Sequence, residues 1–512
     1  MSQQLFDVQT IGAQLSVNAA TWPQQEALVF PEYALRLTWS QLELQVTDVA
    51  RGLLALDLAP GARLALWGVN SPEWVLTFLA AARIGVVTVA LDTGLQAAEF
   101  CRQMQCCRAP VLLMGRGVKG DEYVEALSTV CSDLPDLQTT VVFTPGATDD
   151  QLLPFAELIQ RGHSVTDATL AAIADSVRVD DVVNIQYTSA ALGEPKGVLL
   201  THRQILLNGT LAGQNLRFSA ADRLCIPLPF FHAFGCSLGI LLCLAHGATM
   251  VALTRFTPEG VLGAIDAEGC TSVHGVPTMF VAMLDSADFS RYDLSSLRTG
   301  IMAGAPCPIE VMQQVVERMH ARDMSIAYGQ TEAGPLITQT PLDDPLERRV
   351  STVGVPLPGV EVRIVDPVSG ADCADLISGE LWARGPMIMS GYDGLKDESA
   401  PSPDNDGWLH TGDLAQRDAA GYYRITGRLR NMIIRGGQNV YPAEVENALR
   451  ELHGVEQVRV YGLPDRLYGE IVVAQIVCRS GVSLSDVELT SALRGRLAPY
   501  KIPVQFEFVD KL

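Results

Sequence analysis

Residues 182–200 have the sequence VVNIQYTSAALGEPKGVLL, in which two apolar runs enclose a polar loop. The first run, Val182–Gln186, predicts a strand, and the loop after it carries hydroxyl groups, glycines, a proline and Lys196. Backbone N–H groups, hydroxyls and one ammonium in such a loop can hold a polyphosphate. The loop does not follow the P-loop pattern G-x-x-x-x-G-K-[ST], because its spacing differs and no Ser or Thr follows Lys196. Taken alone, the segment predicts either a phosphate-binding loop or a Gly/Pro turn between two strands.

The chain on both sides of this segment alternates helical and strand patterns. Apolar residues recur at helical spacing over Ser40–Leu56 and Trp74–Ile84, and a short apolar run follows each of these segments. We expect buried strands at Ala62–Gly68, Val86–Leu91, Cys225–Pro227, Gly247–Leu253 and Thr271–Val276. This β-then-α order indicates the α/β class, with parallel sheets flanked by helices.

The amino-acid composition changes after about residue 350, where glycine, proline and aspartate become frequent. The predicted strands shorten there and suit a β-rich subdomain over about residues 350–429: Glu361–Val365, Gly379–Ala383 and Tyr422–Ile425. The remaining residues, 430–512, have an α+β pattern: a helix at Pro442–Leu452 and strands at Val455–Tyr461 and Ile471–Cys478. We therefore predict a large N-terminal domain of stacked α/β sheets over residues 1–429 and a small α+β domain after it.

The length and net charge of the chain limit the number of folding units and the classes of function that it can have. The 512 residues suggest roughly three or four folding units. Acidic residues outnumber basic ones by 58 to 37, which gives a net charge of −21. A field of that sign repels phosphate backbones and anionic lipid surfaces, so nucleic-acid binding is not expected. A nucleotide pocket stays possible, because it needs only a few cations.

Cysteine usage and hydropathy indicate a soluble cytoplasmic protein. The 11 cysteines are scattered, and the sequence has no CxxC pair or zinc-type Cys/His spacing, so we expect buried thiols in a reducing compartment. The N-terminus lacks a basic stretch followed by an apolar run, so no secretory signal is expected. The most apolar window, Phe231–Leu253, contains His232 and His246, which favours buried helix and strand over a membrane span.

Three further segments carry chemical groups. Tyr328–Glu332, with the sequence YGQTE, places a hydroxyl beside a carboxylate that could hold Mg²⁺. Gly407–Asp413, with the sequence GWLHTGD, puts an aspartate after a glycine, where it could clasp ribose hydroxyls. Residues 427–442, GRLRNMIIRGGQNVYP, set basic residues around a glycine turn before a helix that begins near Pro442. Each of the three, taken alone, is equally or better explained as a surface turn.

Together and in this order, the four segments resemble those of the adenylate-forming superfamily. This superfamily includes acyl-CoA synthetases, firefly-luciferase-like enzymes and the adenylation domains of peptide synthetases. The resemblance runs from about residue 25 to residue 512, and the joint occurrence of the four motifs is highly specific. Two stretches most resemble the medium-chain fatty acyl-CoA synthetase branch: Pro227–Gly235 (PLPFFHAFG) and Tyr328–Gly354.

The resemblance implies an enzyme that adenylates a carboxylic acid with ATP and Mg²⁺ and then passes the acyl group to CoA. It implies that Lys196, Thr331, Glu332 and Arg428 are catalytic and that Glu332 is the metal ligand. The implied nucleotide site comprises Thr188, Ser189 and Lys196 at the β- and γ-phosphates, Gly304, Ala305 and Pro306 at adenine, Tyr328 stacked on the base, Gly329, Gln330, Thr331 at the α-phosphate, and Asp413 and Arg428 at ribose.

The resemblance also implies a mobile C-terminal domain that rotates between the two half-reactions about Arg430. Gly436 and Gly437 would then line a tunnel for the acceptor. The acyl pocket would be shaped by Phe231, His232, Phe234, His274, Met279 and Met302, although core packing is the alternative for each phenylalanine and methionine.

Two departures from the family pattern stand out. The usual Ser-Gly-Thr-Thr-Gly is replaced by residues 189–193, SAALG, so fewer donors reach the phosphates and weaker pyrophosphate binding is expected. The sequence ends at Leu512, before the Gly-Lys pair that normally contacts the substrate carboxylate, and Lys511 is too early to replace it. For a C-terminal domain truncated in this way we expect slow adenylation but retained capture of a preformed adenylate.

Three activities remain open at this point. The first is an acyl-CoA synthetase, and the second is a ligase that transfers the acyl group to an amino acid amine, as coronafacate-ligase-like enzymes do. The third is a degenerate homologue that binds nucleotide or acyl-AMP without turnover, against which the intact Lys196, Glu332, Asp413 and Arg428 argue. The sequence indicates neither the acid nor the oligomeric state.

Overall fold

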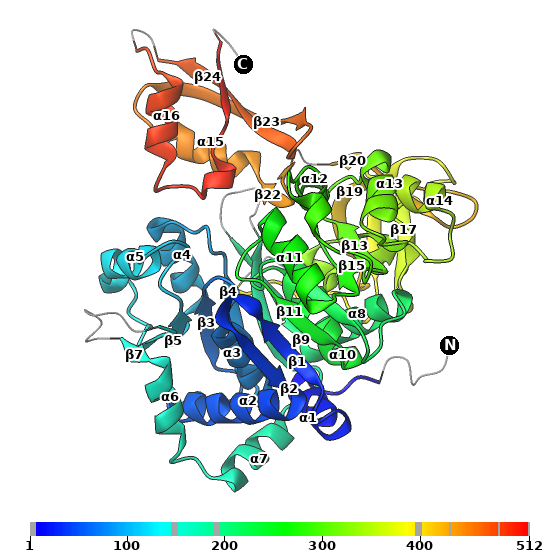
Figure 1. The fold of residues 1–512 in the computed structure, drawn as a ribbon. Helices are drawn as coiled ribbons and strands as arrows, with labels where there is room; N and C mark the ends of the chain where they lie inside the picture. The colour runs from blue at the N-terminus through cyan, green and yellow to red at the C-terminus, as the bar shows by residue number, and fades with distance from the viewer. Residues whose placement is uncertain are drawn as a thin grey trace.

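The computed structural model describes residues 7–144, 152–188, 195–394, 402–429, 432–479 and 482–509. In this part of the chain, two large sheets carry the N-terminal domain, and two smaller sheets follow them in sequence. Figure 1 shows the large sheets side by side, in blue to cyan and in green, with the C-terminal elements in orange and red above them. We call residues 432–509 the C-terminal domain.

The first large sheet is seven-stranded and contains the two strands on either side of the expected phosphate loop. All of its neighbouring pairs are parallel except the last, because β8 turns back directly into β9. The expected strands at 62–68 and 86–91 are its central pair. In order, the strands are β7 (Leu153–Pro154), β6 (Thr139–Val142), β5 (Val111–Met114), β3 (Arg63–Trp67), β4 (Val87–Leu91), β8 (Val182–Thr188) and β9 (Lys196–Thr201).

The second large sheet is nine-stranded, with a parallel centre and antiparallel pairs at both edges. The three later strands expected from the sequence all belong to its centre, so the α/β prediction is confirmed. In order, its strands are β16 (Val355–Pro356), β15 (Leu336–Gln339), β14 (Asp323–Gly329), β13 (Thr299–Ala303), β12 (Ser272–Val273), β10 (Arg223–Ile226), β11 (Thr249–Ala252), β1 (Glu26–Phe30) and β2 (Leu35–Thr38).

Helices fill the space between the two sheets and cover their outer faces. The main core joins both sheets through α1 (Ile11–Thr21), α2 (Trp39–Leu54), α3 (Pro72–Arg83), α6 (Phe155–Gly162), α8 (His202–Asn215), the π-helical turn η4 (Cys236–Leu241) and α10 (Leu242–His246). A second core lies under α11 (Pro258–Glu268), α12 (Pro277–Leu284) and α13 (Ile309–Arg318), and a third under α4 (Ala97–Cys107) and α5 (Glu122–Val130). Three shorter elements complete the layer: α7 (Asp167–Ser176), α9 (Ala233–Gly235) and α14 (Leu346–Ser351).

Local sequence signals explain where the predicted helices start. The helix expected over 40–56 begins at Trp39, because Thr38 caps it and forms a reciprocal capping box with Gln41. The helix expected from Trp74 begins two residues earlier at Pro72, the favoured first position, after the cap Ser71. The apolar window 231–253 forms buried short helices and strand β11, as expected. In the described residues, no helix is long and apolar enough to cross a membrane.

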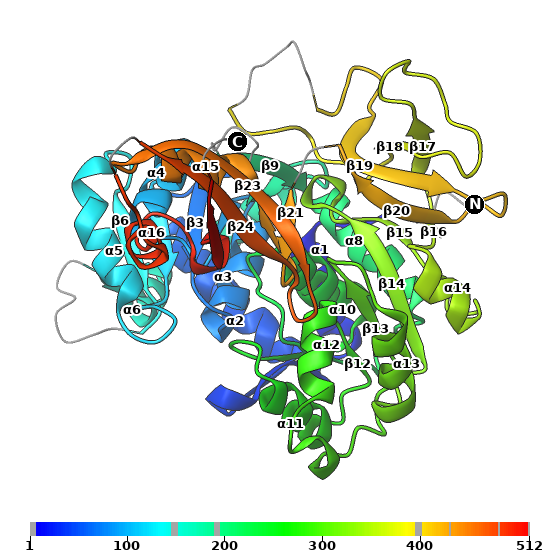
Figure 2. The same cartoon turned by 90° about the horizontal axis from the view of Figure 1, so that it is seen from above.

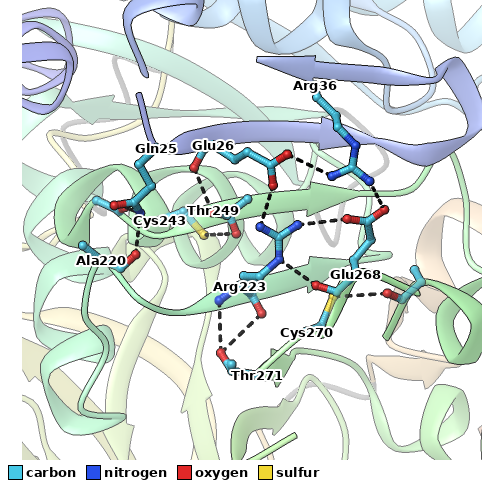
Figure 3. A network of polar contacts seen from close by, with 12 residues as sticks. Gln25, Glu26, Arg36, Ala220, Arg223, Cys243, Thr249, Glu268, Cys270 and Thr271 are labelled. Atoms are coloured by element: carbon cyan, nitrogen blue, oxygen red, sulfur yellow. Dashed lines mark hydrogen bonds and ion pairs between the residues drawn. The ribbon is translucent and has the colours of Figure 1, made fainter. Parts of the chain in front are cut away.

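A ring of charges ties the edge of the nine-stranded sheet together (Figure 3). Arg223 of β10 contacts Glu26 of β1 at 2.7 Å and Glu268, at the end of α11, at 2.9 Å. Arg36 of β2 closes the ring onto the same two carboxylates, at 2.9 and 2.5 Å. Burial raises the pKa of Glu26, but the two guanidinium groups outweigh it and leave this pKa below its ordinary value. The ring therefore fastens the β1–β2 hairpin to the sheet.

The two smaller sheets come from the second half of the chain. The antiparallel four-stranded sheet contains β17 (Glu361–Val365), β18 (Gly379–Arg384), β19 (Leu409–Arg417) and β20 (Tyr423–Arg428). The C-terminal domain packs α15 (Pro442–Arg450) and α16 (Asp486–Leu493) against β22 (Gln438–Val440), β21 (Ile433–Arg435), β24 (Gly469–Cys478), β23 (Val455–Asp465) and β25 (Gln505–Phe508). Figure 2 shows this domain over α4, α5 and the green sheet, with the four-stranded sheet to one side.

Candidate functional site

The predicted motifs meet at a cavity of about 1210 Å³, which we call the large cavity. Strands β13 and β14 end beside it, because carboxyl ends of parallel strands lie at one edge of a sheet. Its wall includes most of the predicted nucleotide residues: Thr188, Gly304, Ala305, Pro306, Tyr328, Gly329, Gln330, Thr331, Glu332, Asp413 and Arg428. These residues are spread over more than two hundred positions of the sequence, and the fold brings them together around one cavity.

A second cavity of about 770 Å³, the small cavity, lies where the C-terminal domain faces α4 and β8. Thr188, His232, Thr331 and Asn439 line both cavities, so the two spaces adjoin. The C-terminal domain supplies one wall of the small cavity through residues of β22, α15 and the short 3-10 helix η7 (Pro499–Lys501). The site is therefore a deep cavity with a channel between the domains beside it.

Strands β8 and β9 hold the phosphate-loop residues that the structure describes. Thr188 and Lys196 are paired across these antiparallel strands at the two ends of the loop. Tyr392 lies between Lys196 and Glu332, because the Lys196 Nζ is 4.8 Å from the Tyr392 ring centroid and the Tyr392 hydroxyl donates to Glu332 Oε1 at 2.9 Å. Ser189 and Ala190–Leu192 lie outside the described residues.

Glu332 is a buried carboxylate in a polar setting. It sits on the 3-10 turn η6 (Thr331–Ala333), and Thr188 Oγ1 also donates to its Oε1, at 3.4 Å. Burial raises the pKa of Glu332 above its ordinary value, against bonds from Tyr392 and Thr188 and the charge of Lys196. Within the described residues no group of three or more His, Cys, Asp or Glu could form a metal cage. A single carboxylate fits Mg²⁺, which commonly takes one carboxylate plus substrate phosphates and water.

The predicted ribose pair is held by a third side chain. Asp413 of β19 is paired in register with Arg428 of β20, and Arg428 Nε lies 3.0 Å from Asp413 Oδ1. The Tyr328 hydroxyl donates to the other carboxylate oxygen at 2.7 Å. Burial raises the pKa of Asp413, and the charge of Arg428 opposes that rise. Tyr328 therefore anchors the carboxylate in addition to lining the expected base site.

The predicted acyl-pocket residues separate into two groups. Phe231, His232 and Phe234 line the cavities, and His232 Nδ1 accepts from the Phe234 backbone N–H at 3.1 Å. His274 is only 1% exposed and lies behind Phe234, with ring centroids 6.2 Å apart. Its Nδ1 accepts from the Ile301 backbone N–H, so it supports the wall rather than forming it.

The structure corrects the expectation for Met302. Neighbours in β13 alternate in direction, so Ile301 and Ala303 face the main core and Met302 faces the second core under α11–α13. Met302 is fully buried there and lines neither cavity. Met279 likewise packs against the main core and lies outside both cavity walls.

The glycine turn between β21 and β22 brings the C-terminal domain against the site. Gly437 lines the large cavity with a φ of +80°, and a Cβ there would lie 2.6 Å from Val276 Cγ1. Gly436, with a φ of +57°, lines neither cavity, and a Cβ there would meet Tyr468 at 3.5 Å. Arg430, the expected hinge, lies outside the described residues, as does Lys511.

Sequence reasoning missed several residues of the site. Tyr392 follows a glycine in an irregular stretch, where no periodic pattern marks it. Gln186 and Tyr187 line the small cavity at the end of β8, and a polar residue ending an apolar strand was the available signal. Lys501 and Glu99 also line it, but they are 402 positions apart, and only the fold brings them together.

Family models match most of the chain. The AMP-binding enzyme model covers residues 15–393, and the AMP-binding enzyme C-terminal domain model covers residues 444–512. YngI of Bacillus subtilis (strain 168), provisionally named an acyl-CoA synthetase, is 41% identical over 98% of this chain and 93% of its own length. The mitochondrial medium-chain acyl-CoA ligase ACSF2 of Macaca fascicularis is 33% identical over 98% of this chain and 84% of its own.

Several solved structures have a fold similar to that of this protein over nearly the whole chain. A double mutant of o-succinylbenzoate CoA synthetase from Bacillus subtilis, bound to a product analogue, has a TM-score of 0.82 at 26% identity, covering 98% of this chain and 95% of that one. The amide bond synthetase McbA of Marinactinospora thermotolerans has a TM-score of 0.83 at 27% identity, covering 98% and 96%. ATP-bound MatB of Rhodopseudomonas palustris has a TM-score of 0.70 at 26% identity, covering 98% and 96%.

Proposed function

Because this chain belongs to the AMP-binding enzyme family, as its four motifs predicted, we propose that it activates a carboxylic acid with ATP and transfers the acyl group to CoA. The observation that carries the proposal is the convergence of Lys196, Glu332, Asp413 and Arg428 on one side of the fold, with a channel between the domains beside them. The first half-reaction would take place in the large cavity, and the second at its junction with the small cavity.

The residues at the phosphate end suit adenylation. Attack of a carboxylate on the α-phosphorus brings two anions together, so the site must neutralise charge and fix an in-line geometry. Lys196 would meet the phosphates from the β9 side of the loop, and Thr331 would donate to the α-phosphate. Glu332 would hold Mg²⁺, which when bound neutralises the charge that develops on the leaving pyrophosphate.

The ribose end orients the nucleotide. Asp413 can accept from ribose hydroxyls because Arg428 and Tyr328 fix its carboxylate in place. Gly304–Pro306 leave the end of β13 open beside this group, which suits a flat base. A carboxylate with two fixed partners loses little conformational freedom when ribose binds. The ribose end of the site would therefore orient the nucleotide as well as contribute to its affinity.

The small cavity suits an acceptor that carries amide groups, as the pantetheine arm of CoA does. Within the described residues, four buried polar atoms of its lining side chains have no hydrogen-bond partner: Gln103 Oε1, Gln186 Nε2, Tyr187 Oη and Glu444 Oε2. Two of these atoms can donate and two can only accept, which matches amide carbonyls and N–H groups. These four atoms are themselves closed off from solvent, so an amide-bearing ligand would satisfy them only if the side chains turned toward the cavity.

The acid is proposed to be a medium-chain fatty acid. The described part of the large-cavity wall includes an apolar group, Phe234, Leu238, Pro277 and Val281, which suits an alkyl chain. The likeness to the medium-chain ligase supports the same assignment. A cytoplasmic location is part of the proposal, since ATP and CoA are both available there.

Transfer to an amine is the second candidate, and the likeness to the amide bond synthetase favours it. We rank this candidate below CoA, because the relatives at 41% and 33% identity are named an acyl-CoA synthetase and an acyl-CoA ligase, whereas the amide bond synthetase is 27% identical. The two candidates share the first half-reaction and differ only in the acceptor.

The experiment follows pyrophosphate release from the full chain with ATP, Mg²⁺ and acetate, octanoate, palmitate or benzoate. CoA or a mixture of amino acids is then added, and products are identified by mass. The proposal predicts fastest pyrophosphate release with octanoate and a thioester as product, and loss of release in Lys196→Met. An amide as sole product would establish the second candidate, and no pyrophosphate with any acid would favour a homologue that binds without turnover.

A further inference from the structure

Lys501 forms a buried ionic contact between the two domains. Its Nζ lies 2.9 Å from Oε1 of Glu99, on α4 of the N-terminal domain, and 2.7 Å from Oε1 of Glu444, on α15 of its own domain. Lys501 and Glu99 are each only 6% exposed. Beside them the Tyr500 hydroxyl donates to Asp92 Oδ2 at 3.1 Å, so η7 seats on the strand end and helix start of the other domain.

Each partner is fixed within its own domain. Glu99 is the third residue of α4, and its other oxygen accepts from the Gln96 backbone N–H at 3.2 Å, which closes the helix cap. On the other side, Arg435 Nη1 donates to the Tyr500 carbonyl at 3.0 Å and holds η7 to β21. The Lys501–Glu99 contact therefore joins one fixed position on each domain. It can form only when the two domains have a particular relative orientation.

The opposite charges of this cluster act against the effect of burial on both sides of the interface. Burial lowers the pKa of Lys501, but the carboxylates of Glu444 and Glu99 outweigh it and keep this pKa above its ordinary value. Burial raises the pKa of Glu99, while the charge of Lys501 opposes that rise. The positive end of α4 also favours a carboxylate at position 99.

A buried ion pair adds little net stability, because desolvation offsets the attraction between the two charges. It is favourable only when the charged groups meet in a well-defined geometry. If the C-terminal domain rotates, Lys501 keeps Glu444 and loses Glu99, so the interdomain half of the cluster exists in one orientation only. This orientation encloses the small cavity, since Lys501 and Tyr500 line it together with Tyr187, Thr188 and Thr331.

The overall structure is more similar to a CoA-analogue-bound relative than to an ATP-bound one. At the same 26% identity and the same 98% coverage of this chain, the TM-score is 0.82 against the synthetase bound to its CoA product analogue and 0.70 against the ATP-bound enzyme. Identity and coverage are equal in the two comparisons, so the higher TM-score shows the greater overall likeness to the enzyme that holds the CoA product analogue.

We propose that Lys501, paired with Glu99 across the domain interface, is a positioning residue that selects the domain orientation in which the acyl group passes to CoA. The inference rests on the proposed function. Neither side chain needs to touch a reacting atom, because the pair acts by fixing η7 and the wall of the small cavity.

The test compares Glu99→Gln with the full-length enzyme. The substitution keeps the shape, the cap of α4 and the internal Lys501–Glu444 pair, and removes only the charge that crosses the interface. Glu488→Gln is the matched control, because Glu488 is also the third residue of a capped helix but lies exposed on α16, away from the interface. Three quantities are measured: pyrophosphate release, thioester formation from a preformed octanoyl-adenylate and CoA, and energy transfer between fluorescent amino acids at the exposed positions Leu44 and Val487.

For Glu99→Gln we expect thioester formation to fall about tenfold, pyrophosphate release to stay within about twofold, and energy transfer to shift, since losing one partner of a buried charge pair costs at least that much. The control should match the unchanged enzyme in all three. Energy transfer that does not change would overturn the proposal, whether or not any acid is turned over, so this arm is independent of the proposed activity. Equal losses in both half-reactions would also overturn it, because a merely structural Glu99 would act on both.

Discussion

Replacing Gly437 by alanine should block the second half-reaction selectively. Gly437 has a φ of +80°, and the added Cβ would lie 2.6 Å from Cγ1 and 3.2 Å from Cβ of Val276 in the N-terminal domain. Val276 is β-branched and only 7% exposed, so it cannot turn away easily. The clash must be relieved by moving the C-terminal domain off the site.

Two free-energy costs determine how far the Gly437→Ala substitution should slow thioester formation. A left-handed backbone costs an alanine about 1–2 kcal/mol, and this falls on the C-terminal domain itself. Overpacking against Val276 costs a further 1–3 kcal/mol, roughly, and this falls only on the orientation in which the domains are in contact. Because about 1.4 kcal/mol is a factor of ten, thioester formation should fall by about 5- to 150-fold.

Gly436→Ala separates the two costs. Gly436 also has a positive φ, +57°, but its added Cβ would meet only Tyr468, at an ordinary 3.5 Å. Both variants should lose similar unfolding free energy in guanidinium titrations, and only Gly437→Ala should lose thioester formation from octanoyl-adenylate and CoA. Equal thioester rates in the two variants would show that Gly437 does not approach Val276 during acyl transfer.

Three further outcomes follow from the structure. Asp413→Asn should raise the KM for ATP about tenfold in pyrophosphate release, because the amide cannot keep both the Arg428 contact at 3.0 Å and two acceptor oxygens; an unchanged KM would contradict the ribose assignment. Arg223→Leu should lower the free energy of unfolding by about 2 kcal/mol in denaturant titration, since it leaves the partly buried Glu26 and Glu268 with Arg36 as their remaining partner in the ring; a loss below about 0.5 kcal/mol would contradict the role of the ring. Burial lowers the pKa of His274 to about 3, so the unfolded state binds this proton first as pH falls below about 6.5, and stability should drop by about 1.4 kcal/mol per pH unit from this histidine until pH 3. His274→Gln should flatten that slope in pH-dependent unfolding, and an unchanged slope would contradict it.

Local patterns predicted much of the fold. Strand β17 has the predicted bounds Glu361–Val365, and α15 begins at the predicted Pro442, because a turn residue or proline marks each start. The described residues of the four motifs lie close together around the large cavity and beside it, because several of them end neighbouring strands. Helix starts were misplaced by one or two residues where a cap, such as Ser71, precedes the apolar pattern.

The sides of buried strands could not be predicted. All five residues of β13 are buried, so no alternation of polar and apolar residues marks which side chains face the site. Met302 was therefore expected in the acyl pocket and lies in the second core instead. Contacts between distant residues were equally hidden: Tyr392 reaches Glu332 across 60 positions and Lys501 reaches Glu99 across 402. Such pairs depend on the packing of whole domains.

In the proposed reaction, an acid is joined to AMP before its acyl group reaches CoA. The direct test supplies octanoate labelled with ¹⁸O in its carboxylate, together with ATP, Mg²⁺ and CoA, and measures the label in AMP by mass spectrometry. Attack on the α-phosphorus makes a carboxylate oxygen the bridging atom, and this oxygen leaves with AMP when the thiol attacks the acyl carbon. We predict one ¹⁸O atom in AMP for each octanoyl-CoA formed. Thioester formed with unlabelled AMP, or with label in phosphate and ADP as product, would exclude an acyl-adenylate intermediate.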